Sequence, residues 1–428
     1  MKTKVAIKSE NITPFGGIFY VIDEFSHLEM DKLIDRVLGL RCSTYGYQYS
    51  EILSSVFYTY YCGGDHIEDI GHHLGPHLEL RPDTRIPSPD TVLRGIKELA
   101  TENIVYQSDS GIKYSFNTGE RLNGLLLDML QHTNQLKPGK DYDLDFDHQF
   151  IPTQKYDTKY SYKKERGYFP GIATIGPLIV GLENRDGNAN VRFHQSDTLK
   201  RIFQRLAHKG VFINRCRMDC GSYSKEIIAT VHGYCNKFYI RASRYESLSN
   251  EISEITDWKQ VELNFENYEV TSIPFTAFME EENYRLVIQR KRKKDSEEDD
   301  LFDGKFVYRC IVTNDWDSTE EEIITFYNAR GTSEKKFDVM NNDFGWSKMP
   351  CSFLNENTAF LLLTAIAANL YLYLIGKIAK VFTDIKPESR IKRFLFRFIA
   401  VPAKWIKTGR RWVLNIYSQK PYHLVWQN

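Results

Sequence analysis

The sequence has no excess of charge of either sign, no paired cysteines and no apolar stretch near its start. Lysine and arginine together number 56, as do aspartate and glutamate, so any attraction to nucleic acid must come from local charge placement. The seven cysteines are scattered without a C-x-x-C pair, which argues against a disulfide framework and predicts a reducing compartment, the cytoplasm. A secretory signal needs about 7 to 15 apolar residues, which the first residues do not supply.

Low-complexity sequence is absent too, and the composition is typical of a globular protein. Hydrophobic residues make up 42% of the 428 residues, enough for a large buried core, and the length predicts two to four packed units of about 150 residues. One apolar run, Ala359–Gly376, has the roughly 18 residues that a membrane span requires. We expect a buried helix instead, because Thr364 and Asn369 would need polar partners in lipid. A membrane-associated interaction protein is the alternative.

The first 140 residues predict a mostly helical, DNA-binding region. We expect helices over 49–61, over 65–74 with Asp65 as the cap, and over 92–100 behind a Ser or Asp cap in the segment 87–91. This order resembles a helix-turn-helix, although any small helical bundle has it. A group of possible zinc ligands nearby matches no standard zinc spacing: Cys62, His66, His72, His73 and His77.

From residue 141 the pattern changes to an α/β core. Asp143, Asp145 and Asp147 alternate with apolar residues, which predicts a strand with the carboxylates on one face. The expected elements that follow are strands over 171–175, 178–182, 211–218 and 237–240, with helices over 196–208 and 224–232. Three antiparallel strands followed by helix, strand, helix, strand is the order of a ribonuclease-H-like mixed sheet.

The remaining sequence divides into three parts. Residues 242–318 are rich in β-branched and aromatic residues and predict a β-rich insertion, with a charged hairpin tip over 290–300 that could contact DNA. A helical pattern over 319–380 completes the core, whose first part is 141–241. The segment 381–428 is basic, with nine Lys or Arg and one Glu between Lys386 and Arg411.

Three carboxylates are candidates for chemistry. Asp147, or its neighbour Asp145, lies on a strand face, where a carboxylate needs a pairing charge or a cation; a solvated edge strand is the alternative. Asp219 follows the strand 211–218, at the strand end where sites of α/β sheets gather, and could equally cap a turn. Glu334 would share a helical stripe with Tyr327 and Arg330, or form a solvated pair with Arg330.

Two aspartates and a glutamate are hard oxygen ligands. They would suit two Mg²⁺ or Mn²⁺ ions about 4 Å apart, holding the attacking and the leaving oxygen of a phosphodiester. On the same stripe, Arg330 could bind a phosphate or hold the Glu334 carboxylate, and Tyr327 could support a cut DNA end.

Four segments in order resemble the DDE transposases of bacterial insertion sequences, in particular insertion-sequence family 1380, which is related to family 4. They are Leu144-Asp145-Phe146-Asp147, Gly167-Tyr168-Phe169-Pro170, Arg217-Met218-Asp219-Cys220-Gly221-Ser222-Tyr223 and Tyr327-x2-Arg330-x3-Glu334. The resemblance implies a ribonuclease-H-like core with the β insertion between the second Asp and the Glu. It implies Asp147, Asp219 and Glu334 as metal ligands, with Asp145 as the fallback for the first.

The resemblance also implies an activity and departs from the family at one residue. Such an enzyme binds the terminal inverted repeats of its element, cleaves DNA by metal-dependent hydrolysis and joins the 3′ ends to target DNA. The family signature has a lysine seven residues after the glutamate, where this chain has Asn341. Lys335, Lys336 and Lys348 are possible replacements. A domesticated or inactive relative, acting as a nuclease or DNA-binding protein, is the alternative.

Two basic segments are expected to follow the phosphate backbone of double-stranded DNA, the transposon ends and the target. In the first, tyrosines alternate with cations as on a base-stacking surface, although a solvated loop would have the same composition. We expect a homodimer on DNA, no membrane contact, and association with the bacterial nucleoid when bound. The predicted DNA-binding residues are Lys155, Lys159, Lys163, Lys164, Arg166, Lys404, Lys407, Arg410 and Arg411.

Overall fold

The structure, a computed structural model, describes residues 3–8, 10–41, 45–243, 252–278, 283–292 and 306–427, and only the backbone of residues 332–334. Most of the predicted charged tip, 293–300, therefore lies outside the described residues, as does the side chain of Glu334.

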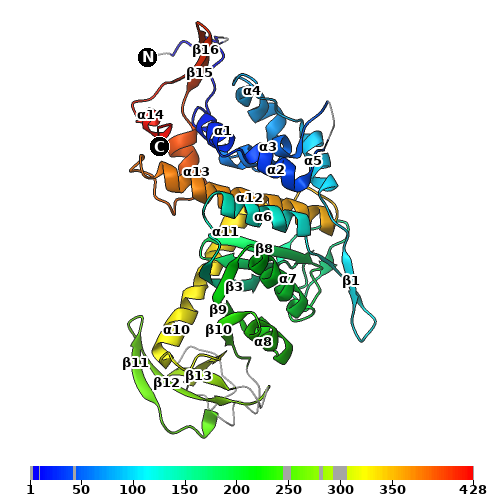
Figure 1. The fold of residues 1–428 in the computed structure, drawn as a ribbon, viewed down its shortest axis with the longest axis vertical. Coiled ribbons are helices and arrows are strands. Elements are labelled where there is room, and N and C mark those ends of the chain that lie inside the picture. The colour runs from blue at the N-terminus through cyan, green and yellow to red at the C-terminus, as the bar shows by residue number, and fades with distance from the viewer. Residues whose placement is uncertain are drawn as a thin grey trace.

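An eleven-stranded mixed sheet runs through the lower half of the molecule in Figure 1, in the order β1-β2-β8-β7-β3-β9-β10-β14-β13-β12-β11. The neighbours β3, β9 and β10 are parallel, and all the other pairs are antiparallel. Its strands are β1 (Ile104–Gln107), β2 (Lys113–Asn117), β3 (Lys140–His148), β7 (Gly171–Ile175), β8 (Leu178–Arg185), β9 (Val211–Met218), β10 (Cys235–Arg241), β11 (Lys259–Leu263), β12 (Glu266–Phe275), β13 (Tyr284–Arg292) and β14 (Phe306–Thr313).

The α/β class predicted from the sequence is confirmed, and the middle strands lie where the alternation placed them. β7 and β9 match their expected bounds, while β8 extends three residues further, to Arg185. Helices α7 (Gln195–His208) and α8 (Lys225–His232) pack on β9 and β10, and the side chain of Ser224 caps α8 by accepting the N–H of Ile227.

The apolar run forms α12 (Leu354–Ile378), a central helix of the fold. It is long and apolar enough to cross a membrane, yet 83% of its most apolar window is buried inside the protein. Helices α3, α5 and α6 and strand β8 all pack against it, which confirms the expected buried helix. The amide of Asn369 finds the partners that it needs on β8, donating to the carbonyl of Ile179 at 2.8 Å and accepting its N–H at 3.0 Å.

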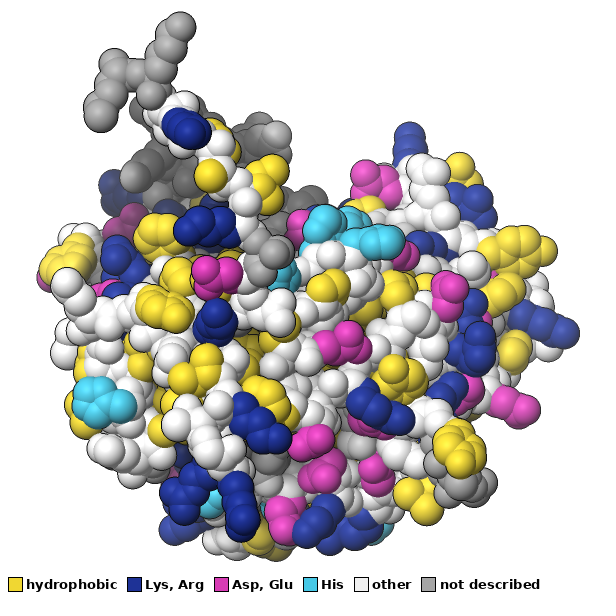
Figure 2. All heavy atoms as spheres, turned by 90° about the horizontal axis from the view of Figure 1, so that it is seen from above, with side chains coloured by type: hydrophobic (Ala, Val, Ile, Leu, Met, Phe, Trp, Pro, Cys, Tyr) yellow, Lys and Arg dark blue, Asp and Glu magenta, His cyan; other side chains and the backbone are white. Residues whose placement is uncertain are grey.

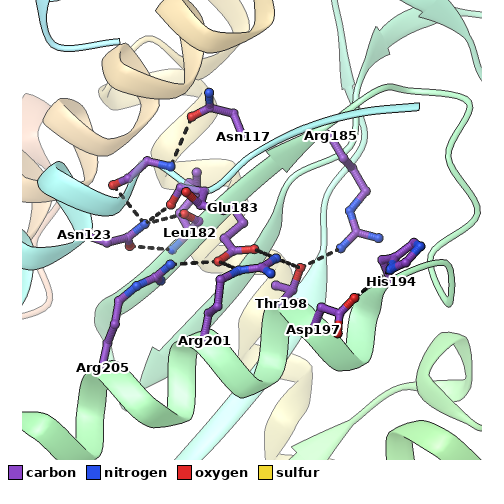
Figure 3. A network of polar contacts seen from close by, with 12 residues as sticks. Asn117, Asn123, Leu182, Glu183, Arg185, His194, Asp197, Thr198, Arg201 and Arg205 are labelled. Atoms are coloured by element: carbon purple, nitrogen blue, oxygen red, sulfur yellow. Dashed lines mark hydrogen bonds and ion pairs between the residues drawn. The ribbon is translucent and has the colours of Figure 1, made fainter. Parts of the chain in front are cut away.

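Strand β8 is held on both sides by buried polar contacts, which Figure 3 shows. The side-chain amide of Asn123, in α6 (Glu120–His132), donates to the carbonyl of Leu182 at 2.8 Å and accepts the N–H of Leu182 at 3.0 Å. Asn369 binds Ile179 in the same way. The carboxylate of Glu183 is fully buried and accepts hydrogen bonds from Arg201 and Arg205 of α7 at 2.7 to 2.9 Å. These contacts fix the helices on the sheet because a buried polar group without a partner would cost about 1 to 3 kcal/mol.

Above the sheet in Figure 1 lies the N-terminal helical region. Its third helix has the predicted bounds, and α5 begins three residues earlier than expected, capped by Ser88. The prediction for 65–74 is wrong, since helix begins only at Ile70: the carboxylate of Asp69 accepts the N–H groups of Asp65 and His66 and holds them in a turn. The helices are α1 (Ile18–His27), α2 (Met30–Leu38), α3 (Tyr49–Tyr61), π-helix η1 (Ile70–Leu74), α4 (Gly75–Leu78) and α5 (Pro89–Glu98).

Hairpin β1–β2 was not predicted within this region, and it extends the central sheet through β8. At the other end, the β-rich segment supplies β11 to β14, and β14 pairs with β10, so these strands continue the same sheet. They pack on α10 (Glu320–Asn328) around a second hydrophobic cluster that includes Val270, Val287 and Ile324. The domain boundaries drawn from the sequence stay predictions.

The other elements surround these layers. A small three-stranded sheet comprises β4 (Ile151–Pro152), β5 (Lys159–Tyr160) and β6 (Arg166–Tyr168). The basic C-terminal segment forms helices and hairpin β15–β16, whose Ala403 bonds Thr13 near the N-terminus. The remaining elements are η2 (Cys220–Ser222), η3 (Ala329–Thr332), α11 (Ser333–Asp343), η4 (Trp346–Lys348), α13 (Ile391–Phe394), η5 (Leu395–Ile399), β15 (Ala403–Thr408), β16 (Arg411–Ile416) and α14 (Tyr422–Val425).

Candidate functional site

Two candidate aspartates meet where the parallel strands β3 and β9 end. Phe146 of β3 is the register partner of Met218 of β9. Asp147 directly follows Phe146, and Asp219 directly follows Met218. Because the two strands are parallel, the two aspartates lie side by side. This edge is the one at which α/β sheets concentrate their sites.

A guanidinium from the 3₁₀ turn η3 lies between these carboxylates. Nη2 of Arg330 is 3.3 Å from Oδ2 of Asp147 and 4.0 Å from Oδ2 of Asp219. The side chains of Arg330 and Asp147 are 14% and 17% exposed, while that of Asp219 is 40% exposed. The pair therefore opens to solvent on the side of Asp219.

The electrostatics of Asp147 show a shortage of positive charge. Burial and the charge of Asp219 raise the pKa of Asp147 and Arg330 lowers it, with a net value of about 6. The N–H of His148 also donates to Oδ1 of Asp147 at 2.9 Å. One guanidinium shared between two carboxylates thus leaves part of their charge uncompensated.

Asp219 caps a turn and also faces the guanidinium of Arg330. Its Oδ1 accepts the N–H of Gly221 at 3.0 Å and so caps the 3₁₀ turn η2, while its Oδ2 faces Arg330. The capping bond fixes the carboxylate and leaves the outer oxygen available to a ligand.

Asp145, the fallback for the first ligand, is engaged in an ion pair. Both of its oxygens accept from Arg217 of β9, at 2.6 and 3.0 Å, and its side chain is 6% exposed. Arg217 also donates to the carbonyl of Phe326 at 2.6 Å, so it ties β3 and β9 to α10. Sequence reasoning missed Arg217. Its signal was the alternation of Arg215 and Arg217, which matches that of Asp143 and Asp145 on the neighbouring strand.

Tyr327 and Arg330 both border the site but do not share one regular helix. The α-helix α10 ends at Asn328, the 3₁₀ turn η3 follows, and α11 begins at Ser333. The hydroxyl of Tyr327 donates to the carbonyl of Met218 at 3.2 Å, directly before Asp219. The expectation of a continuous helical stripe was therefore wrong, since Arg330 lies in a 3₁₀ turn between the two helices and turns to Asp147.

Glu334 belongs to the first turn of α11, the element that directly follows Arg330. Of the lysines that could replace the signature lysine at Asn341, Lys336 is largely buried, with its Nζ 2.9 Å from Oγ1 of Thr174 and 4.0 Å from Asp145. Burial lowers the pKa of Lys336. Lys348 pairs with Asp65 at 2.8 Å, and Lys335 is exposed. Lys348 is exposed too, so its ion pair is what distinguishes it from Lys335.

The residues at this edge fit a divalent cation. Asp147 and Asp219 are hard oxygen donors on neighbouring strands, and a cation bound there would oppose the rise in the pKa of Asp147 that burial and the charge of Asp219 cause. Among the described side chains no group of three His, Cys, Asp or Glu gathers closely enough to hold a metal ion, and this includes the histidines after Cys62. Glu334, the third ligand that the resemblance implies, has its side chain outside the described residues.

The predicted DNA-binding residues occupy two surfaces. Lys159, Lys163, Lys164 and Arg166 are exposed on the small sheet, which begins three residues after β3 and lines a cavity of about 530 Å³, while Lys155 is half-buried. The guanidinium of Arg166 donates to the carbonyl of Thr158 at 2.8 Å, so it also has a structural role.

The second surface is hairpin β15–β16. Lys407, Arg410 and Arg411 are exposed there, and Lys404 pairs with Glu10 at 3.1 Å. Figure 2 looks down on the end of the molecule that carries this hairpin and shows Lys and Arg mixed with acidic and hydrophobic side chains. Such mixing is expected of a chain without net charge.

The whole chain matches one protein-family model. Residues 2–428 match the model described as transposase DDE domain group 1. The fold is similar to that in the cryo-EM structure of a piggyBac transposase synaptic complex with hairpin DNA, with a TM-score of 0.45 and 11% identity over 90% of this chain and 78% of that one. A Drosophila P element transposase strand transfer complex matches with a TM-score of 0.22 and 14% identity, over 47% and 40% of the two chains. No curated protein matches the sequence.

Proposed function

Because this chain belongs to the transposases with a DDE domain, group 1, we propose that it mobilises its own insertion sequence. It binds the terminal inverted repeats as double-stranded DNA, cuts by metal-dependent hydrolysis and joins the freed 3′ ends to target DNA. The observation that carries this proposal is the convergence of Asp147, Asp219 and Arg330 at the end of β3. The assignment to insertion-sequence family 1380 stays a prediction.

The sheet order supports a ribonuclease-H-like core. Strands β8, β7 and β3 form an antiparallel meander, and β9 and β10 then join β3 in parallel through the helices α7 and α8. Strands β11 to β14 lie between Asp219 and Glu334 along the chain, where the resemblance implied an insertion. The core would therefore be closed by α10 and α11 after the insertion.

Asp147, Asp219 and Glu334 would hold two Mg²⁺ or Mn²⁺ ions. When bound, such ions activate the attacking oxygen and stabilise the leaving oxygen of a phosphodiester. Asp147 is preferred to Asp145 because Arg217 already takes both oxygens of Asp145. Hydrolysis and strand joining are both in-line displacements at phosphorus, so the same carboxylates can serve them in turn.

Arg330 and Tyr327 would position the DNA. A guanidinium forms paired hydrogen bonds to phosphate oxygens, and Arg330 is the cation nearest to the aspartates. Tyr327 is fixed by its bond to Met218 next to Asp219 and would support the cut end. The basic small sheet and the C-terminal hairpin would contact the phosphate backbone, and two copies would hold two transposon ends as a homodimer on DNA.

The proposal is tested by cleavage of a duplex that carries the element's ends, with Mg²⁺ or Mn²⁺ supplied. We expect Asp147→Asn, Asp219→Asn and Glu334→Gln each to abolish cleavage and to retain end binding, because most binding energy comes from phosphate contacts. Asp143→Asn is the matched control, since Asp143 lies on the same strand and pairs with Arg215. Full cleavage by Asp219→Asn would refute the proposal, and size measurement of the end complex tests the dimer.

A further inference from the structure

A pocket at the C-terminal end of the chain has no function in the reaction described above. It has a volume of about 610 Å³, within the range of roughly 300 to 1,000 Å³ that is typical of ligand sites. Three of the six tryptophans of the chain line it, Trp405, Trp412 and Trp426, together with Tyr422 and His423. Hairpin β15–β16, which carries part of its wall, lies at one end of the molecule, well away from β3 and β9 (Figure 1).

The pairing register puts the aromatic residues of the hairpin on one face with a cation. Trp405 pairs with Leu414 and Lys407 pairs with Trp412, and residues that face each other in an antiparallel pair point to the same side. Nζ of Lys407 lies 5.7 Å from the centroid of the Trp412 ring. Lys404 and Arg411 belong to the alternate positions and so to the other face.

The inner aromatic walls are rigidly held. Nε1 of Trp426 donates to Oδ2 of Asp23 at 2.9 Å, and its ring meets Tyr20 edge to face at 5.2 Å. Trp405 meets Phe19 in the same way at 5.4 Å. Trp412 and Trp426 nevertheless remain 49% and 37% exposed. Fixed aromatic faces open to solvent are preorganised for stacking with a planar ligand.

The charge of this region identifies the kind of ligand. Residues 389–428 contain nine Lys or Arg and no Asp or Glu. Some of these cations are neutralised from elsewhere in the chain, but Lys407, Arg410 and Arg411 have no carboxylate partner among the residues that the structure describes. A ligand with planar rings and negative charge at close spacing matches both features, and nucleic acid is such a ligand.

We infer that this pocket binds an unpaired nucleobase of single-stranded DNA, while Lys407 and Arg410 contact the adjoining phosphates. A base in a duplex is stacked on both faces and paired along one edge and cannot enter, whereas an unpaired base offers its face to an aromatic ring. Stacking of this kind is tolerant of sequence. The inference rests on the proposed function for the phosphate contacts of hairpin β15–β16, and it adds the aromatic pocket, which lies apart from the two aspartates and requires no cleavage.

The test measures, by fluorescence anisotropy, how tightly the full-length protein binds a fluorescent oligothymidine in the absence of divalent metal. A duplex of equal length is measured in parallel. We expect Trp412→Ala and Trp426→Ala each to weaken single-strand binding by about 5-fold to 100-fold, the range for loss of one stacked base. Trp316→Ala is the matched control, because Trp316 is 42% exposed and lies outside the pocket. It should bind as the unmodified protein does.

The salt dependence separates stacking from charge contacts. Trp412→Ala should leave the slope of log affinity against log salt unchanged, whereas Lys407→Gln should flatten it by about 0.7 per lost phosphate contact. Thermal midpoints of the variants are measured alongside, and Trp412→Ala should keep its midpoint because the ring is exposed. Unchanged single-strand binding by both tryptophan variants would overturn the inference. So would equal losses on duplex and single strand, or a pocket that proves to bind a second copy of the chain.

Discussion

Arg330 reaches from the 3₁₀ turn η3 to Asp147 at the end of β3, and the same Nη2 atom lies 3.3 Å from Asp147 and 4.0 Å from Asp219. The arginine is thus the counter-charge of both aspartates. Its position makes the arginine a competitor of any cation that the two carboxylates bind.

Replacing Arg330 by glutamine should have opposite effects on stability and on metal affinity. Without metal, we expect the free energy of unfolding to fall by about 3 kcal/mol, because a largely buried carboxylate loses its partner. Mn²⁺ affinity, measured by calorimetry without DNA, should rise about tenfold or more, since the positive charge that opposes the ion is gone. Arg215→Gln is the control, because its partner Asp143 lies away from the site. An unchanged Mn²⁺ affinity would show that Arg330 does not compete with the ion.

The raised pKa of Asp147 predicts a pH dependence of stability. An unfolded aspartate titrates near 3.9, and the folded one titrates at about 6, so the folded protein binds more protons between these values. The contribution of Asp147 to stability therefore falls as pH rises from about 4 to about 6, by up to about 3 kcal/mol. We expect Asp147→Asn to gain stability over the metal-free original protein across this window, as measured by urea unfolding at several pH values.

Asp186 is the internal comparison for that measurement. Burial also raises its pKa to about 6, although it pairs with the N–H of Ser115 away from Arg330. Asp186→Asn should change the pH profile in the same direction, and the double variant should add the two effects. If Mn²⁺ is added, the pH profile of stability should flatten only for proteins that retain Asp147. Parallel pH profiles for Asp147→Asn and the original protein would contradict the assigned shift.

The small sheet should bind duplex DNA mainly through charge. Changing both Lys163 and Lys164 to glutamine should weaken binding of any duplex sequence, and should flatten its salt dependence by about 0.9 per lost phosphate contact. Lys32→Gln is the control, because Lys32 is exposed and paired with Glu29. A loss confined to one DNA sequence would mean that these lysines read bases, and no loss would identify a solvated loop.

Asn369 should stabilise the protein even though it interrupts the most apolar helix. Its amide satisfies the buried N–H and carbonyl of Ile179, and Asn369→Leu would leave both without a partner. We expect a loss of about 2 to 6 kcal/mol, at 1 to 3 kcal/mol for each of the two unsatisfied groups, and a lower thermal midpoint. Asn342→Leu on the exposed side of α11 should cause little change. A higher midpoint for Asn369→Leu would indicate that α12 prefers a less polar surrounding than the structure gives it.

Local sequence predicted the elements of the core because their signals are local. The apolar and polar alternation placed β7 and β9 within their observed bounds, and the Ser224 cap located the start of α8. Two predictions failed where a side-chain contact that the pattern did not indicate accompanies a different backbone, one local and one between distant residues. Asp69 prevented helix at 65–69, and the contact of Arg330 with Asp147 accompanies the 3₁₀ turn between α10 and α11.

The sequence by itself determined which residue types were available: the alternating aspartates of β3, Asp219 after β9, the polar residues before Glu334, and the tryptophans of the acid-free C-terminus. Only the tertiary structure decided between Asp145 and Asp147 as the accessible carboxylate. The two residues share one strand face and one local pattern, so their difference lies in neighbours distant in sequence. Arg217 forms an ion pair with Asp145 across the two parallel strands. Asp147 lies two residues further along β3 and shares Arg330 with Asp219. Burial and pairing depend on which strands lie side by side, and long-range packing sets that arrangement.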